Sequence, residues 1–164
     1  MSSGAKWGRM GFFKKRALMN SMFIGEYRHN IDVKGRVAIP AKFRNKLSGG
    51  AIVTRGIDRC LFAFSPEDWE KLAEKLIALP ITQSNSRAFS RLMLAGAVEC
   101  EIDSQGRVLI PDYLRKYAGL GKDAVVAGLY NRIEIWNASE WDAYKSKTES
   151  ESESIAEKMG ELGI

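Results

Sequence analysis

The chain has 164 residues and a formal net charge of +5, and 45% of its residues are apolar. No apolar run approaches the roughly 20 residues that a membrane helix needs, so we expect a soluble globular protein. Five basic residues and no acidic residue fall within 1–21, which leaves 22–164 neutral overall. Overall charge therefore gives only weak support for a nucleic-acid partner.

Residues 1–21 are expected to lie outside the fold, as a basic extension that is either a tag or a disordered arm. Lys14, Lys15 and Arg16 interrupt the only apolar stretch that could serve as a signal peptide. We therefore expect a cytoplasmic protein.

Residues suited to catalysis or metal binding are sparse. His29 is the only histidine, and we expect it to be partly buried on a strand. Cys60 and Cys100 each stand among apolar residues with no second cysteine nearby, which predicts small buried side chains. The chain also has no glycine-rich phosphate-binding motif and no Cys/His cluster. We predict that it is not an enzyme and uses no cofactor, no metal and no small-molecule substrate.

The main feature is an internal repeat of about 44 residues. A shift of 71 residues aligns 31–40 (IDVKGRVAIP) with 102–111 (IDSQGRVLIP), and a shift of 72 aligns Trp69 with Trp141. The predicted units are a first copy at 26–68, a helical connection at 69–96, a second copy at 97–140, and a C-terminal helix with a polar tail at 141–164.

Alternating apolar residues and turn residues predict the same elements in both copies. In the first copy, strands are expected at 27–31, 36–39, 51–55 and 60–64, with a helix at 41–47. In the second copy, strands are expected at 98–102, 107–110, 124–127 and 133–136, with a helix at 112–118. Ser65 and Asn137 are predicted to cap a closing helix in each copy.

Two more segments complete the chain. A helix is expected at about 86–94, within the connection between the copies. The Ser/Glu stretch at 148–154 has nothing apolar to bury, so it is expected to be disordered or the end of a helix.

Each copy is centred on an Asp-x-x-Gly-Arg turn. An aspartate at the first turn position can accept a hydrogen bond from the backbone two residues on, and glycine is favoured at the fourth position. The residues expected to set the turn geometry are Asp32, Gly35, Asp103 and Gly106.

A unit of about 44 residues buries too little apolar surface to be secure alone, and neither a metal nor a disulfide is expected. The two copies should therefore pack their apolar faces together with pseudo-twofold symmetry, as a homodimer would.

The paired turns, each followed by Val-x-Ile-Pro, and the Met22-Phe23-x-Gly25 opening closely resemble the MraZ proteins over residues 22–146. The resemblance implies a β-rich α+β fold, in which two tandem SpoVT-AbrB-like repeats with flanking helices form a pseudo-twofold swapped-hairpin β-barrel. It also implies a ring-like homo-oligomer. The implied function is a DNA-binding transcription regulator at the nucleoid, a repressor of the division and cell-wall gene cluster that binds repeated promoter boxes in double-stranded DNA.

The resemblance implies that Arg36 and Arg107 are presented to DNA. Their neighbours Lys34 and Gln105 differ in charge, which argues that the two turns contact DNA unequally. From the residues alone, each arginine could instead form an ion pair with the aspartate four positions earlier and fix the turn. Both roles are compatible, because an aspartate that orients an arginine reduces the entropy lost on binding.

Four other cations are second-tier candidates for DNA contact, with a solvated charged face as the simpler interpretation. They are Arg28, Lys42, Arg44 and Arg115.

Five aromatic residues at strand or helix spacing are expected in the core rather than as base-stacking platforms, which argues against a single-stranded nucleic-acid partner. They are Phe62, Phe64, Trp69, Trp136 and Trp141. The alternative function is a protein-binding or antitoxin-like module without direct DNA contact. Steep salt dependence of duplex binding would separate the two hypotheses.

Overall fold

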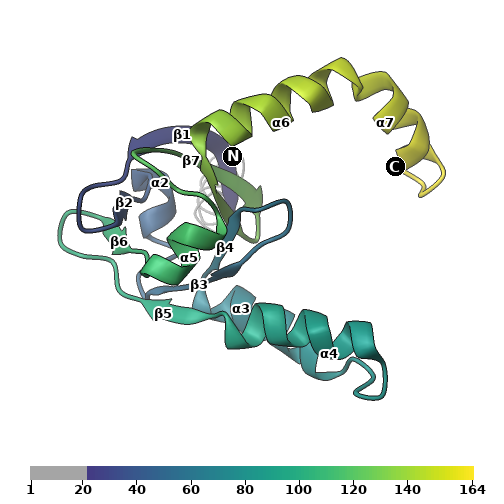
Figure 1. Ribbon diagram of the computed structural model, residues 1–164, viewed down its shortest axis with the longest axis horizontal. Coiled ribbons are helices and arrows are strands. Elements are labelled where there is room, and N and C mark those ends of the chain that lie inside the picture. Colours follow the sequence, from purple (N-terminus) through teal and green to yellow (C-terminus); the bar gives the residue numbers. More distant parts are fainter. Residues whose placement is uncertain (1–21) are drawn as a thin grey trace, which may run out of the picture.

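The computed structural model describes residues 22–164, so the predicted extension at 1–21 lies outside the described residues. The fold is α+β and contains one six-stranded antiparallel sheet and one two-stranded antiparallel ribbon (Figure 1). The strands are β1 (Phe23–Asn30), β2 (Arg36–Ala38), β3 (Ala51–Arg55), β4 (Leu61–Phe64), β5 (Val98–Cys100), β6 (Arg107–Leu109), β7 (Asp123–Tyr130) and β8 (Ile133–Asn137). The sheet has the order β1-β7-β8-β4-β3-β5, and the ribbon joins β2 to β6.

Six α-helices and one π-helical turn accompany the strands in the described residues. They are α2 (Ala41–Arg44), α3 (Pro66–Ile77), α4 (Ser84–Ser90), the π-helical turn η1 (Arg91–Ala95), α5 (Asp112–Tyr117), α6 (Ala138–Ser150) and α7 (Ser152–Gly160). Both predicted caps are confirmed. The Ser65 hydroxyl accepts a hydrogen bond from the Asp68 N–H, and the Asn137 side chain accepts from the N–H groups of Ser139 and Glu140.

The two copies exchange strands across the sheet. The first strand of each copy pairs with the third strand of the other, β1 with β7 and β5 with β3. Equivalent strands of the two copies also pair with each other. β4 pairs with β8 at the centre of the six-stranded sheet, and β2 pairs with β6 in the ribbon. The expected packing of the copies against each other is therefore present as interleaved backbone pairing.

Two apolar clusters form the core, and β4 contributes to both because its side chains alternate in direction. Leu61 and Ala63 face the larger cluster, which includes the ribbon residues Val37 and Val108. Phe62 and Phe64 face the second cluster with Trp136, and Trp69 and Trp141 pack against that cluster from α3 and α6. The predicted core placement of all five aromatic residues is confirmed, as are the burial of both cysteines and the partial burial of His29.

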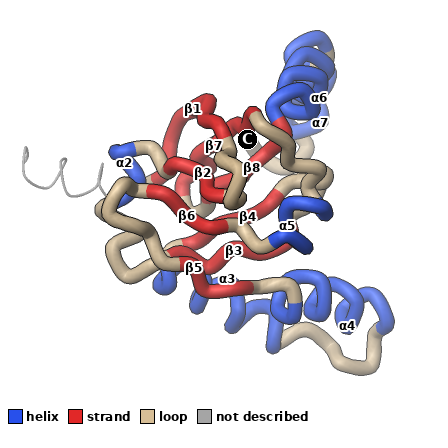
Figure 2. Tube along the Cα trace, turned by 60° about the vertical axis from the view of Figure 1, so that its left-hand side comes forward, coloured by secondary structure: helices blue, strands red, loops and turns tan. Residues whose placement is uncertain are grey.

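Some boundaries differ from expectation. The helix predicted at 41–47 ends at Arg44, and the next residues form turns with hydrogen bonds between residues three apart. The helix predicted at 86–94 is an α-helix continued by a π-helical turn. Disorder at 148–154 was the wrong alternative, because α6 continues to Ser150 and α7 follows directly. Figure 2 shows the α3–α4 hairpin and the α6–α7 arm extending from opposite sides of the β-strand body.

Candidate nucleic-acid interface

The Asp32 carboxylate organises the first turn. One of its oxygens accepts hydrogen bonds from the backbone N–H of Lys34 at 2.9 Å and of Arg36 at 3.0 Å. The other oxygen accepts from Arg36 Nε at 2.6 Å. Gly35 closes the turn with an N–H donated to the Asp32 carbonyl, and its φ of 85° is a conformation that glycine adopts without strain.

The second turn repeats this arrangement. The Asp103 carboxylate accepts from the N–H groups of Gln105 and Arg107, both at 2.9 Å, and from Arg107 Nε at 3.0 Å. Gly106 has a φ of 75°. Both copies therefore have the expected turn hydrogen bonds, and both have the ion pair with the aspartate that the sequence left open as an alternative role of the arginine.

These contacts stabilise the ionised carboxylates. The backbone N–H of Arg36, followed by its guanidinium and the N–H of Lys34, holds the pKa of Asp32 below its ordinary value. The backbone N–H groups of Arg107 and Gln105 and the Arg107 guanidinium lower the pKa of Asp103 in the same way. At neutral pH both turns therefore hold an ionised aspartate bound to an arginine.

The β2–β6 ribbon brings the two turns together. The Ile39 N–H donates to the Gly106 carbonyl at 2.8 Å, and the Ile110 N–H donates to the Gly35 carbonyl at 2.9 Å. Arg107 also reaches across, with 3.6 Å between its Nη1 and the Asp32 carboxylate. Arg36 and Arg107 thus belong to a single composite surface, defined here as the paired-turn surface: residues 32–36 and 103–107.

Arg44 and Arg115 also hold the turns, each from the opposite copy. Arg115 Nη1 donates to the Lys34 carbonyl at 3.2 Å, and a methyl group added at Gly35 would lie 1.2 Å from that same nitrogen. Arg44 lies over Gly106 in the same manner, 2.2 Å from where a methyl group would be, and its Nε donates to the Ile39 carbonyl. Arg115 is therefore partly buried against the first turn, whereas Arg44 stays exposed beside the second.

The remaining candidate cations are more peripheral. Arg28 forms an exposed ion pair with Asp142, and the Lys42 ammonium lies 5.7 Å from the centre of the Tyr27 ring. The side chains of Lys34 and Gln105 are exposed on their turns.

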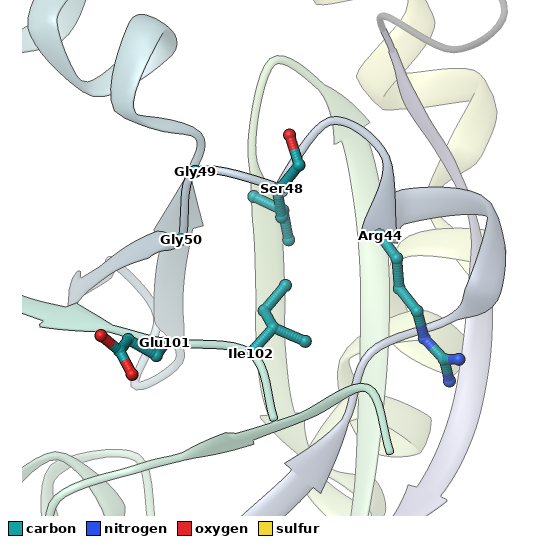
Figure 3. A pocket seen from close by; sticks show the side chains of 7 residues that line it. Arg44, Ser48, Gly49, Gly50, Glu101 and Ile102 are labelled. Carbon is teal, nitrogen blue, oxygen red and sulfur yellow. The ribbon is translucent and has the colours of Figure 1, made fainter. Parts of the chain in front are cut away.

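Figure 3 shows a pocket of about 490 Å³ next to α2. Its charged lining residues, Arg44 and Glu101, stand on opposite sides of the opening, so no acid–base pair faces a common point. Within residues 22–164, no three His, Cys, Asp or Glu side chains gather into a metal-binding group, and no helix could cross a membrane.

A family model described as "MraZ protein, putative antitoxin-like" matches the chain twice, at residues 22–92 and 93–161. The chain belongs to the MraZ family. It is 52% identical over 143 residues to the transcriptional regulator MraZ of Acetivibrio thermocellus, 51% to that of Halothermothrix orenii and 50% to that of Natranaerobius thermophilus. Each alignment covers 87% of this chain and the whole of the relative. MraZ membership confirms the resemblance found in the sequence and identifies a transcriptional regulator rather than an enzyme.

Sequence reasoning missed the crossing of Arg44 and Arg115 between copies. A pattern that indicates a shared role was present, because each of these residues follows its turn arginine by eight positions in both copies of the MraZ repeat. The spacing does not reveal the strand exchange, and it is the exchange that places each arginine beside the turn of the other copy.

Proposed function

We propose that the protein is a sequence-specific double-stranded DNA-binding regulator that contacts DNA with Arg36 and Arg107 on the paired-turn surface. The observation that carries this proposal is the attachment of each guanidinium to its own aspartate through Nε. That contact orients each arginine through Nε rather than through its terminal nitrogens, although Nη1 of Arg107 also lies 3.6 Å from the Asp32 carboxylate. Guanidinium groups are suited to phosphates and to guanine edges in the major groove.

The neighbouring residues have secondary roles in this proposal. Lys34 adds a cation beside Arg36, whereas Gln105 beside Arg107 offers a neutral donor and acceptor, so the two turns contact DNA unequally. Arg28 and Lys42 supply peripheral phosphate contacts. Arg44 and Arg115 hold the turn backbones as well as adding positive charge.

The wider proposal follows the family. The regulator represses the division and cell-wall gene cluster at the nucleoid in the cytoplasm, as a ring-like oligomer on repeated promoter boxes. Within each chain, units at 26–68 and 97–140 close the two sheets into a swapped-hairpin barrel. Repeated boxes suit a ring, because weak contacts from several subunits add through effective concentration.

Selection of genomic fragments by the purified protein at near-physiological salt would identify the bound boxes and their spacing. Duplexes carrying those boxes would then be titrated with protein at several salt concentrations. We expect affinity to fall steeply with salt, because each phosphate contact releases counterions. Salt-insensitive or absent duplex binding would reject the DNA proposal and favour the second candidate, a protein-binding module, which the antitoxin-like description of the family model suggests.

A further inference from the structure

The C-terminal arm carries three large apolar side chains that remain partly exposed, named here the α7 stripe: Ile155, Met159 and Leu162. Ile155 and Met159 lie about one turn apart on α7, and Leu162 follows two residues after the end of the helix. Ile155 and Met159 are 38% and 37% exposed, Leu162 is 72% exposed, and no residue of α7 is buried. A helix of nine residues is marginal in water on its own, because most helical stability comes from packing an amphipathic face. The stripe therefore offers apolar surface to a partner.

An apolar groove of about 370 Å³ runs along the α3–α4 hairpin. Ile77 and Ile81 beside it are 74% and 79% exposed, although both are large apolar side chains. The apolar residues that line the groove are Leu76, Ile77, Leu79, Pro80, Ile81 and Leu94. Arg87 and Arg91 form its cationic side.

The groove and the C-terminal segment carry opposite charges. Residues 84–95 contain two arginines and no acid, whereas residues 151–164 contain four glutamates and one lysine. Opposite charges that approach within the Debye length, about 10 Å at 0.1 M salt, attract each other. An amphipathic helix that inserts side chains at i, i+4 and i+7 into an apolar groove is a recurrent mode of recognition.

The same chain cannot fill its own groove. Figures 1 and 2 both show α7 and the α3–α4 hairpin on opposite sides of the β-strand body. We propose that α7 of one copy docks in the α3–α4 groove of a second copy of this chain. The contact is head-to-tail, so each subunit uses both surfaces, and the resulting assembly closes into a ring or continues as a filament. This inference rests on the oligomer of the proposed function and names the contact that builds it.

The test measures the mass of the purified full chain without DNA, by sedimentation velocity, for the original sequence and three variants. Ile155→Asp alters the α7 stripe and Ile81→Asp alters the groove, while Ile57→Asp is the control, because Ile57 is 53% exposed in the β3–β4 turn. We expect the original protein and the control to form oligomers. Both test variants should need at least roughly tenfold higher concentration to do so, because a charge buried against an apolar surface is costly.

Mixing the two test variants gives a sharper result. The Ile81→Asp chain retains a normal α7 and the Ile155→Asp chain retains a normal groove, so the mixture should form a dimer and nothing larger. A chain that ends at Glu151 should behave as the Ile155→Asp variant does, which guards against a local effect of the new charge. Circular dichroism would verify that each variant is folded.

The inference is overturned if the variants keep the original mass, if their mixture stays monomeric, or if the original protein is itself a monomer. DNA binding is measured separately on a duplex with one box. A variant that is monomeric yet still binds this duplex supports both proposals, whereas an oligomer that binds no duplex leaves the docking contact intact and rejects the DNA function.

Discussion

At the scale of single residues, Asp32 and Asp103 connect turn geometry to pH. Their pKa values are lowered in the folded protein, so their contribution to stability is complete above the ordinary aspartate value of about 3.9. That contribution is lost as the pH falls through the lowered folded-state values. We expect the Asp32→Asn/Asp103→Asn variant to show a weaker dependence of unfolding on pH below about 4, monitored by circular dichroism during acid titration. Asp58→Asn, in an exposed turn, is the control.

Arg36 and Arg107 are the residues on which the DNA proposal depends. Arg36→Ala and Arg107→Ala should each weaken duplex binding and reduce the slope of log affinity against log salt by about one for each phosphate that the arginine neutralises. Fluorescence anisotropy at four salt concentrations measures both effects, and Lys147→Ala on α6 is the control cation. If the arginines only fix the turns, the variants would instead lose thermal stability and keep the original salt slope.

A substitution at Gly35 tests whether Arg115 positions the first turn. Gly35→Ala and Gly119→Ala should both cost about 1–2 kcal/mol, because alanine is strained at positive φ. Only the change at Gly35 displaces the Arg115 guanidinium, since nothing lies within 4 Å of an added methyl at Gly119. We therefore expect Gly35→Ala to weaken duplex binding more than Gly119→Ala at equal stability. Equal binding by the two variants would show that Arg115 does not position the turn.

At the scale of elements, the π-helical turn η1 depends on a buried side chain. The hydroxyl of Thr54, which is fully buried, donates to the Met93 carbonyl at 2.6 Å. Thr54→Val keeps the shape of the side chain but removes this buried hydrogen bond, so we expect a loss of about 1 kcal/mol in chemical denaturation. Thr148→Val, on the solvated α6 helix, should change stability by less than about 0.5 kcal/mol. A similar loss in both variants would contradict this role for Thr54.

The elements differ in how well local sequence predicts them. The Asp32–Gly35 turn and the caps at Ser65 and Asn137 were predicted correctly, because their hydrogen bonds lie within four residues of chain. The π-helical turn was not predicted, because apolar periodicity indicates which side of a helix is buried but not which carbonyl accepts a hydrogen bond from each N–H. For the C-terminal arm a helix was predicted, and disorder at 148–154 stayed open as an alternative because the Ser/Glu composition of that stretch offers nothing apolar to bury.

At the scale of the whole molecule, the strand exchange determines what can fold. A cut after Thr82, in the exposed α3–α4 connection, separates the two copies without breaking a strand. We expect residues 1–82 and 83–164 to be unfolded when produced separately, because each half loses the partner of its first strand. Produced together, they should form a folded one-to-one complex, detected by co-purification and circular dichroism. An independently folded half would contradict the exchange.

The internal repeat predicted that the two copies pack together but not which strands pair between them. Two units with apolar faces could stack as complete modules, and nothing local distinguishes that arrangement from one in which β1 and β5 change places. The placement of Arg115 beside Gly35 depends on this exchange. The sequence therefore predicted the two turns of the candidate site but not the arginines that pack against them.

The joining of both turns in one chain has a consequence for the direction in which a promoter is recognised. A homodimer of identical units matches a palindromic site, because the symmetry of the protein imposes the same symmetry on the DNA. Here one half of the paired-turn surface carries Lys34 and the other carries Gln105. Under the proposed DNA function, a fused pair with unlike halves is free of that constraint, so each subunit would distinguish the two strands of its site.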